Sequence, residues 1–214
     1  MDNLPDIIGS LKEIDLDVAD VFNIFVYGSR IYGTHTGESD WDILVVLNDD
    51  SSFILNEGIN NYFTIGILDI TVLKLENVKN ELRQHNMQRI ELLWPPLQNV
   101  LPLQNDLLQF FVLDRKMLRV AVSTISNKCM GYAKILWLKE NDIKKSKKNV
   151  FHSIRYVLFG AQIALTGKIT NYEAANDYLY QMQKCTLLDW FQFHEIYGKK
   201  AKELHKYFLS VVEQ

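Results

Sequence analysis

Residues 21–47 have the sequence VFNIFVYGSRIYGTHTGESDWDILVVL, and the order of features in this stretch decides the fold. Val21 to Tyr27 is β-branched and aromatic, which predicts a buried strand that stops at Gly28. Residues 43–47 form a second apolar run, closed by turn-forming residues. The stretch therefore predicts a strand, a turn, a polar connection and a second strand.

Asp40 and Asp42 stand two positions apart at the entry to the second strand. Alternate strand residues point to the same face, so the two carboxylates should lie together while Trp41 and Ile43 point into the core. Adjacent carboxylates repel each other, and a divalent cation is the usual way to offset that repulsion. We expect these acids to bind Mg²⁺, with Mn²⁺ as an alternative, and Asp69 on a later strand to complete a catalytic two-metal site.

Gly28 and Ser29 follow the first strand directly and are expected to open a short helix. Glycine lets the backbone approach a ligand closely, and the Ser29 hydroxyl and the N–H groups of a helix start can donate to phosphate oxygens. Arg30 is the next residue, and Gly33-Thr34 adds a flexible point before the acidic pair. We therefore assign Gly28, Ser29 and Arg30 to binding a nucleoside triphosphate.

Each feature has a simpler explanation when it is taken alone. An Asp-x-Asp pair most often marks a solvated strand edge, and Gly-Ser after a strand is usually only a turn. Their order along the chain, with a third acid on a later strand, favours catalysis over coincidence. The assignment of Asp69 depends on a strand register that is inferred rather than seen.

Away from this stretch the pattern is mixed at first and then helical. We expect a helix over 7–20, a third strand over 63–73 and helical spacing from Glu76 to Trp94, ended by Pro95-Pro96. Residues 99–102 are expected to form a short connection or an edge strand. Five further helices are expected over 107–127, 130–140, 148–166, 172–182 and 187–212. Gly167 is a good helix stop and Asn171 a good helix start.

These elements predict an α+β fold with two domains. Residues 1–104 would form a small mixed β-sheet domain with flanking helices, which carries the catalytic acids. Residues 105–214 would form an all-helical domain that binds the substrate.

The composition is that of an ordinary globular protein, with 48% hydrophobic and 23% charged residues among 214. A net charge of −3 argues against a protein that mainly coats nucleic acid, although it does not exclude a local basic cleft. Cys129 and Cys185 are far apart, which disfavours a disulfide framework or a zinc site. The start of the chain lacks signal-peptide features, and no apolar stretch approaches the roughly 20 residues that span a bilayer. We expect a soluble cytoplasmic protein with no membrane partner.

Residues 25–47 resemble the nucleotidyltransferases of the DNA polymerase β superfamily. The signature of that superfamily is an apolar strand, Gly-Ser or Gly-Gly, and an Asp-h-Asp pair in which h is apolar. The residues at these positions are Gly28, Ser29, Asp40 and Asp42. Trp41 fills the apolar position, and the third metal-binding acid would fall on Asp69. The resemblance implies metal-dependent transfer of a nucleoside monophosphate from a nucleoside triphosphate such as ATP.

A closer resemblance is to the polymerase-β-like nucleotidyltransferases associated with RNA repair pathways. The shared features are Gly28-Ser29-Arg30, Tyr32-Gly33 and Ser39 to Asp42. Residues 86–93, NMQRIELL, resemble the Asn-Pro-x-x-h-Glu-h-h segment of that group, with Met87 in place of the proline. Lys148, His152, Arg155 and Gly167 resemble its helical region. This resemblance implies an acceptor hydroxyl that includes an RNA end.

Lys148, His152 and Arg155 recur at i, i+4 and i+7, so a helix turning about 100° per residue places them within roughly 60° of one another. The opposite side of that helix is apolar, from Val150 to Leu165. Such a basic stripe would bind a triphosphate or an RNA phosphate, or it would be a solvated surface. Glu91 is equally explained as a structural hydrogen-bond acceptor. The remaining histidines show no metal-ligand spacing: His35, His85, His194 and His205.

Other functions fit the same residues. Protein nucleotidylation of the AMPylation type would use the same metal site with a Tyr, Ser or Thr hydroxyl as the acceptor. A nucleotide-sensing regulatory module, or an antitoxin-like binding partner, would keep the pocket without the chemistry, although two intact adjacent acids favour activity. A template-directed polymerase is disfavoured because the chain leaves little room for domains that grip a duplex. The sequence carries no signal for the oligomeric state.

Overall fold

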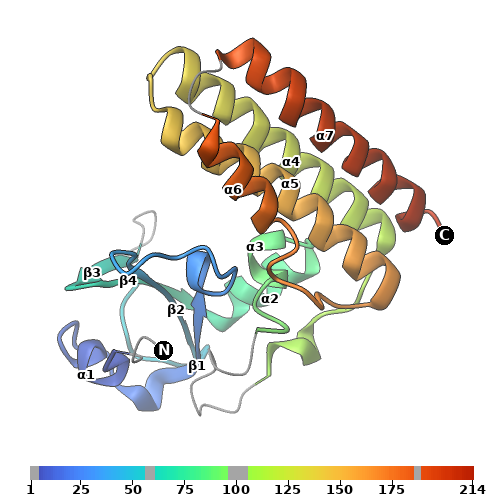
Figure 1. Ribbon diagram of the computed structural model, residues 1–214. Helices are drawn as coiled ribbons and strands as arrows, with labels where there is room; N and C mark the ends of the chain where they lie inside the picture. The colour runs from blue at the N-terminus through green and yellow to red at the C-terminus, as the bar shows by residue number, and fades with distance from the viewer. Residues whose placement is uncertain (1–4, 56–60, 96–105, 186–188) are drawn as a thin grey trace. The chain divides into compact units, whose positions relative to one another are not determined.

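The computed structural model describes residues 5–55, 61–95, 106–185 and 189–214. The chain divides into two compact units, Met1–Arg83 with Gln88–Phe111 and Gln84–Met87 with Val112–Gln214. The first unit contains a β-sheet with helices and the second is helical (Figure 1). The α+β fold class predicted from the sequence is confirmed. The domain boundary predicted after residue 104 lies outside the described residues.

The sheet has four strands in the order β1-β2-β4-β3. The strands are β1 (Val21–Tyr27), β2 (Trp41–Leu47), β3 (Tyr62–Ile65) and β4 (Leu68–Lys74). β1 is antiparallel to β2, β2 is parallel to β4, and β3 is antiparallel to β4. The sheet is therefore mixed, and the two strands that carry Asp42 and Asp69 are neighbours at its centre.

One face of the sheet packs on α1 (Ile7–Lys12). Trp41 and Ile43 belong to this core, as the alternation of β2 predicts. The helix expected over 7–20 is too long, because the backbone turns left-handed at Asp15 (φ +56°) and the Leu16 N–H returns to the Leu11 carbonyl over 3.0 Å. Only a short 3₁₀ turn, η1 (Val18–Asp20), follows before β1.

The opposite face of the sheet contacts α2 (Leu75–Arg83), whose Val78 and Leu82 are fully buried. Leu44 and Val46 are buried on β2, toward the end where that strand finishes. Asp42 and Asp69 lie at the other end of β2 and β4 and remain partly exposed. The apolar packing thus stops where the acids begin.

The single strand expected over 63–73 is in fact a hairpin of β3 and β4. The chain reverses at Gly66-Ile67, and Gly66 has a φ of +57°. Glycine adopts such a conformation without steric cost, and two-residue hairpin turns commonly place it there. The loose alternation of apolar and polar residues along this segment conceals the reversal.

The remaining described elements are helical: α3 (Met87–Ile90), η4 (Leu107–Phe110), α4 (Arg115–Leu138), α5 (Ile143–Thr166), α6 (Asn176–Lys184) and α7 (Trp190–Val212). The prediction of two helices over 107–127 and 130–140 is wrong, because the single helix α4 runs unbroken from its N-cap Asp114 to Leu138. Gly167 ends α5 with φ +77°, as predicted. Asn171 does not start a helix; its side chain accepts from the Glu173 N–H over 2.8 Å, and α6 begins later.

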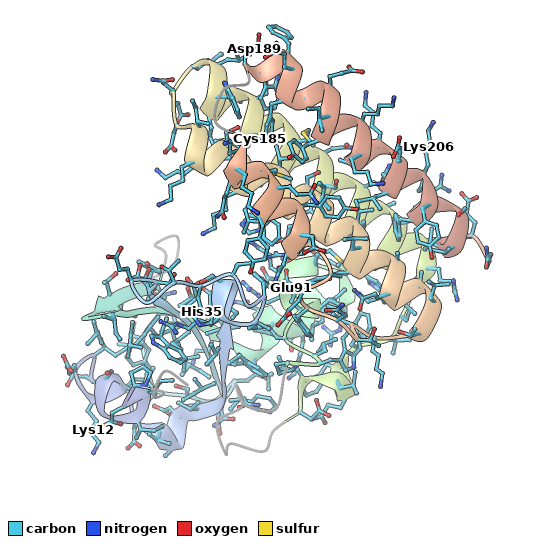
Figure 2. All side chains as sticks on the ribbon, in the orientation of Figure 1. Lys12, His35, Glu91, Cys185, Asp189 and Lys206 are labelled. Carbon is cyan, nitrogen blue, oxygen red and sulfur yellow. The ribbon has the colours of Figure 1, made fainter. Side chains whose placement is uncertain are left out.

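Acidic or amide side chains at the starts of the long helices explain their boundaries. Asp142 caps α5 by accepting from the Lys145 N–H, so that helix begins before the predicted residue 148. Asp189, labelled in Figure 2, caps α7 in a capping box with Gln192. The residues at 99–102 lie outside the described residues. Across the described ranges, no helix combines the length and apolar character that crossing a membrane requires.

Candidate active site

A polar row crosses the sheet where β1 ends and β2 and β4 begin. Tyr27 pairs with Asp42, Asp42 pairs with Asp69, and Asp69 pairs with Thr64. Residues in register on neighbouring strands point to the same face. β2 and β4 therefore bring Asp42 and Asp69 side by side, one on each of two parallel strands.

Gly28 lies directly against the first of these acids. It starts the 3₁₀ turn η2 (Gly28–Arg30) with φ +74°. A Cβ at this position would be 1.9 Å from Asp42 Oδ2 and 2.7 Å from Asp42 Cγ. Glycine is thus required twice here, by the backbone conformation and by the carboxylate that fills the space of a side chain.

Asp69 accepts hydrogen bonds from hydroxyl groups on β3. The Thr64 hydroxyl donates to Asp69 Oδ1 over 3.0 Å. The pKa of Tyr62 is raised, first because its hydroxyl is hydrogen-bonded to the Asp69 carboxylate and then because of partial desolvation. A carboxylate that accepts from the phenol stabilises the protonated form of that phenol. Asp69 therefore presents a negative charge to neighbouring hydroxyls.

Tyr27 occupies the other end of the row. Its pKa is raised mainly by burial, and the negative charges of Asp42 and Asp69 add to that effect. Its hydroxyl lies 3.3 Å from the Thr71 hydroxyl, a contact that partly opposes the rise. The acids are therefore flanked on this side by a phenol that stays neutral.

Arg30 holds the loop that connects η2 to β2. Its guanidinium donates to the Ser39 carbonyl over 2.6 Å and to the Asp40 carbonyl over 3.3 Å. It also stacks on the Trp41 ring, with Cζ 3.8 Å from the ring centroid. These contacts fix the backbone on which Asp40 is carried, while the Asp40 side chain is exposed. Arg30 is therefore a clamp on the acidic segment, and its expected role in nucleotide binding stays a prediction.

The same loop is tied down by a buried hydrogen bond between Tyr32 and Glu91. The Tyr32 hydroxyl donates to Glu91 Oε2, and the two residues are only 5% and 3% exposed. Glu91, labelled in Figure 2, follows α3 in the same unit. The Glu of the 86–93 segment therefore has a structural role, one of the alternatives that the sequence leaves open.

Ser29 lies in η2, between the glycine and the clamp. Its carbonyl accepts from the Thr34 N–H over 2.9 Å, which folds the chain back after the turn. Its hydroxyl makes no hydrogen bond within the described part of the chain, and the residue is partly exposed. The Ser29 hydroxyl is thus available to a phosphate oxygen.

Lys148, His152 and Arg155 belong to α5 in the second unit. They do not form an evenly exposed basic stripe, since Lys148 is exposed but Arg155 is 2% exposed and packs near the rings of Phe151 and Tyr156. Burial, and then the charges of Arg155 and Lys148, hold the pKa of His152 well below its usual range. His152 is therefore a neutral imidazole near pH 7.

The donor chemistry of the polar row fits a hard divalent cation. Asp42 and Asp69 offer carboxylate oxygens from adjacent strands, and Gly28 leaves room for one of them where a Cβ would stand. Within the residues that the structure describes, no group of three or more His, Cys, Asp or Glu side chains is gathered around one point. Mg²⁺ commonly uses one or two carboxylates and completes its shell with water and substrate phosphates, so a pair of acids suffices for a site that loads together with its nucleotide.

Four hydroxyl residues on this face of the sheet were not predicted from the sequence: Tyr27, Tyr62, Thr64 and Thr71. The period-two alternation of the strands carries part of that signal, because Tyr62, Thr64, Asp69 and Thr71 occupy alternate positions. The alternation predicts this shared face only when the hairpin at Gly66 is recognised. The turn sets the register of β3 on β4, and that register pairs Thr64 with Asp69.

Comparisons with known proteins bear on this site. The family profile described as the nucleotidyltransferase domain matches residues 4–148. No curated protein is similar to the chain in sequence. Among solved structures, a nucleotidyltransferase-like protein from Exiguobacterium sibiricum 255-15 aligns over 96% of this chain and 73% of that chain, at 10% identity and a TM-score of 0.32.

Proposed function

This chain belongs to the nucleotidyltransferase domain family, and on that basis we propose that it moves a nucleoside monophosphate from a nucleoside triphosphate to an acceptor hydroxyl in a reaction that depends on Mg²⁺. The observation that carries the proposal is the register of Asp42 with Asp69, with the Asp42 carboxylate packed on Gly28. Two carboxylates held side by side on adjacent strands repel each other when both are charged. They suit a ligand that brings both positive and negative charge, such as a metal–triphosphate complex.

The protein residues in this reaction bind and orient. Asp42 and Asp69 would hold Mg²⁺, with Mn²⁺ as a substitute, and the bound ion would supply charge neutralisation of the triphosphate. The Ser29 hydroxyl donates to a phosphate oxygen, and the Gly28 backbone allows that oxygen to come close. Asp69 accepts from the acceptor hydroxyl, as it now accepts from protein hydroxyls.

Arg30 contributes to the same site by positioning its acids. By holding the carbonyls of Ser39 and Asp40, it fixes the positions of the acids before any ligand arrives. Preorganised carboxylates need no rearrangement when the transition state forms, which is the usual source of rate enhancement in such sites. The proposal thus gives Arg30 a positioning role.

We further propose that an RNA end supplies the acceptor hydroxyl. This finer statement is supported by the resemblance of residues 28–42 and 86–93 to RNA-repair-associated nucleotidyltransferases. Transfer to a protein hydroxyl is the competing outcome.

The test is incubation of the full chain with each α-labelled triphosphate and Mg²⁺ or Mn²⁺, together with a panel of RNA ends and candidate proteins. We expect label on a hydroxyl of an RNA end and stoichiometric release of pyrophosphate. Label on protein alone would replace the RNA acceptor with protein nucleotidylation. Neither label nor pyrophosphate with any triphosphate would contradict the transferase activity itself.

A further inference from the structure

Tyr62 carries an exposed phenol on the same face of the sheet as Asp69. Asp69 is the acid that we propose accepts from the acceptor hydroxyl. In the register of β3 with β4, Tyr62 pairs with Thr71 and Thr64 pairs with Asp69, so all four side chains share one face of the sheet. Tyr62 and Asp69 are thus diagonal neighbours across β3 and β4, a separation that an aromatic side chain can bridge, and Tyr62 is 48% exposed. A nucleophile of this protein therefore already stands beside Asp69.

The proposed transfer requires an acceptor hydroxyl at the same carboxylate. We propose that Tyr62 is itself such an acceptor, so that the chain attaches a nucleoside monophosphate to its own Tyr62 hydroxyl. The inference rests on the proposed function, because it uses the same triphosphate and the same acids. It adds a modification site on the chain that performs the transfer.

The reaction balances without any additional reagent. Tyr62 Oη attacks the α-phosphorus of the triphosphate and forms a P–O bond. The bond between the α-phosphorus and the α–β bridging oxygen breaks, and pyrophosphate leaves. The hydroxyl proton passes to the Asp69 carboxylate and then to water. The product is a phosphodiester between Tyr62 and the nucleoside.

Exposure alone does not select Tyr62. Four tyrosines are exposed to nearly the same extent: Tyr62 (48%), Tyr132 (49%), Tyr180 (45%) and Tyr207 (50%). Among these, Tyr62 is the one that shares a sheet face with Asp69, diagonal to it across the β3–β4 pair. Thr64 also donates to Asp69, but an aliphatic hydroxyl ionises far less readily than a phenol, whose ordinary pKa is about 10. The geometry therefore predicts one modified tyrosine.

The experiment uses the full chain, ATP labelled at the α-phosphate and Mg²⁺, with peptide mass spectrometry as the readout. We expect the nucleotide on the peptide that contains Tyr62. Tyr62→Phe should abolish this self-labelling, whereas Tyr132→Phe, a change at a tyrosine of equal exposure, should leave it unchanged. The labelled fraction per chain should not change on dilution, because donor and acceptor share one molecule.

The outcomes separate this inference from the proposed function. A wild-type chain that labels an added RNA or protein acceptor but leaves Tyr62 unmodified overturns the inference and keeps the function. Label on Thr64 or on the other exposed tyrosines also overturns the inference. A labelled fraction per chain that rises with chain concentration overturns it as well. A chain that releases no pyrophosphate and labels nothing contradicts the proposed function, and the inference falls with it.

Discussion

Replacing Gly28 with alanine tests the coupling between the turn and the acidic pair. The added Cβ would lie 1.9 Å from Asp42 Oδ2, whereas ordinary non-bonded contact is about 3.5 Å. The Asp42 carboxylate must therefore retreat by roughly 1.5 Å. The φ of +74° at this position also costs an L-residue about 1–2 kcal/mol.

We expect Gly28→Ala to remain folded but to lose transferase activity. A misplacement of about 1 Å at a reacting group can reduce the rate about 100-fold, so kcat should fall by at least that factor at saturating Mg²⁺. The free energy of unfolding should fall by about 1–3 kcal/mol, from backbone strain plus the relaxation around Asp42. Urea unfolding measures the stability, and pyrophosphate release measures kcat.

Gly167→Ala is the matched control. Gly167 has φ +77°, and no atom lies within 4 Å of the position that its Cβ would take. Alanine there should therefore cost the same backbone strain, about 1–2 kcal/mol, with kcat unchanged. If both variants lose stability equally and Gly28→Ala keeps wild-type kcat, then Gly28 is only a turn residue and the reasoning about Asp42 is refuted.

The other predictions concern the loop and α5. Arg30→Lys keeps the charge but loses the planar guanidinium fork, so kcat and the apparent affinity for Mg²⁺ should both fall in a steady-state titration. Arg83→Lys, at an exposed ion pair, should change neither quantity, and equal effects of the two substitutions would refute the role of Arg30 as a clamp. Tyr32→Phe removes a donor to the buried Glu91 carboxylate and should lower the free energy of unfolding by about 1–3 kcal/mol in urea, and a value near zero would refute that role. The pKa of His152 is lower in the folded state than in the unfolded state, so its contribution to stability is present above about pH 6.5 and is lost as the pH falls toward the folded-state pKa. The wild type should lose about 1 kcal/mol more than His152→Gln between pH 7.5 and pH 5.5, and parallel pH profiles would contradict this.

The first two strands were predictable because their signals are local. Val21 to Tyr27 is apolar except for Asn23 and is followed by a glycine, so its bounds agree with β1. The alternation around Trp41 also predicts which side of β2 enters the core. Both inferences depend on side-chain type over a few consecutive residues.

The errors arose where a backbone conformation or a distant partner decides the structure. The left-handed residue Asp15 ends α1, and the hairpin at Gly66 divides an apolar run, and neither leaves a strong pattern. The contacts of Arg30 with the Ser39 and Asp40 carbonyls were equally invisible.

The most direct test of the paired-acid site compares Asp42→Asn with Asp50→Asn. Asp50 is exposed and follows the opposite end of β2, so both variants remove one carboxylate from the same part of the chain. The measurement is pyrophosphate release and transfer of label from α-labelled ATP with Mg²⁺, at matched protein concentration. We predict that Asp42→Asn reduces transfer by at least about 100-fold while Asp50→Asn retains the wild-type rate. Equal transfer by Asp42→Asn and the wild type would contradict the account.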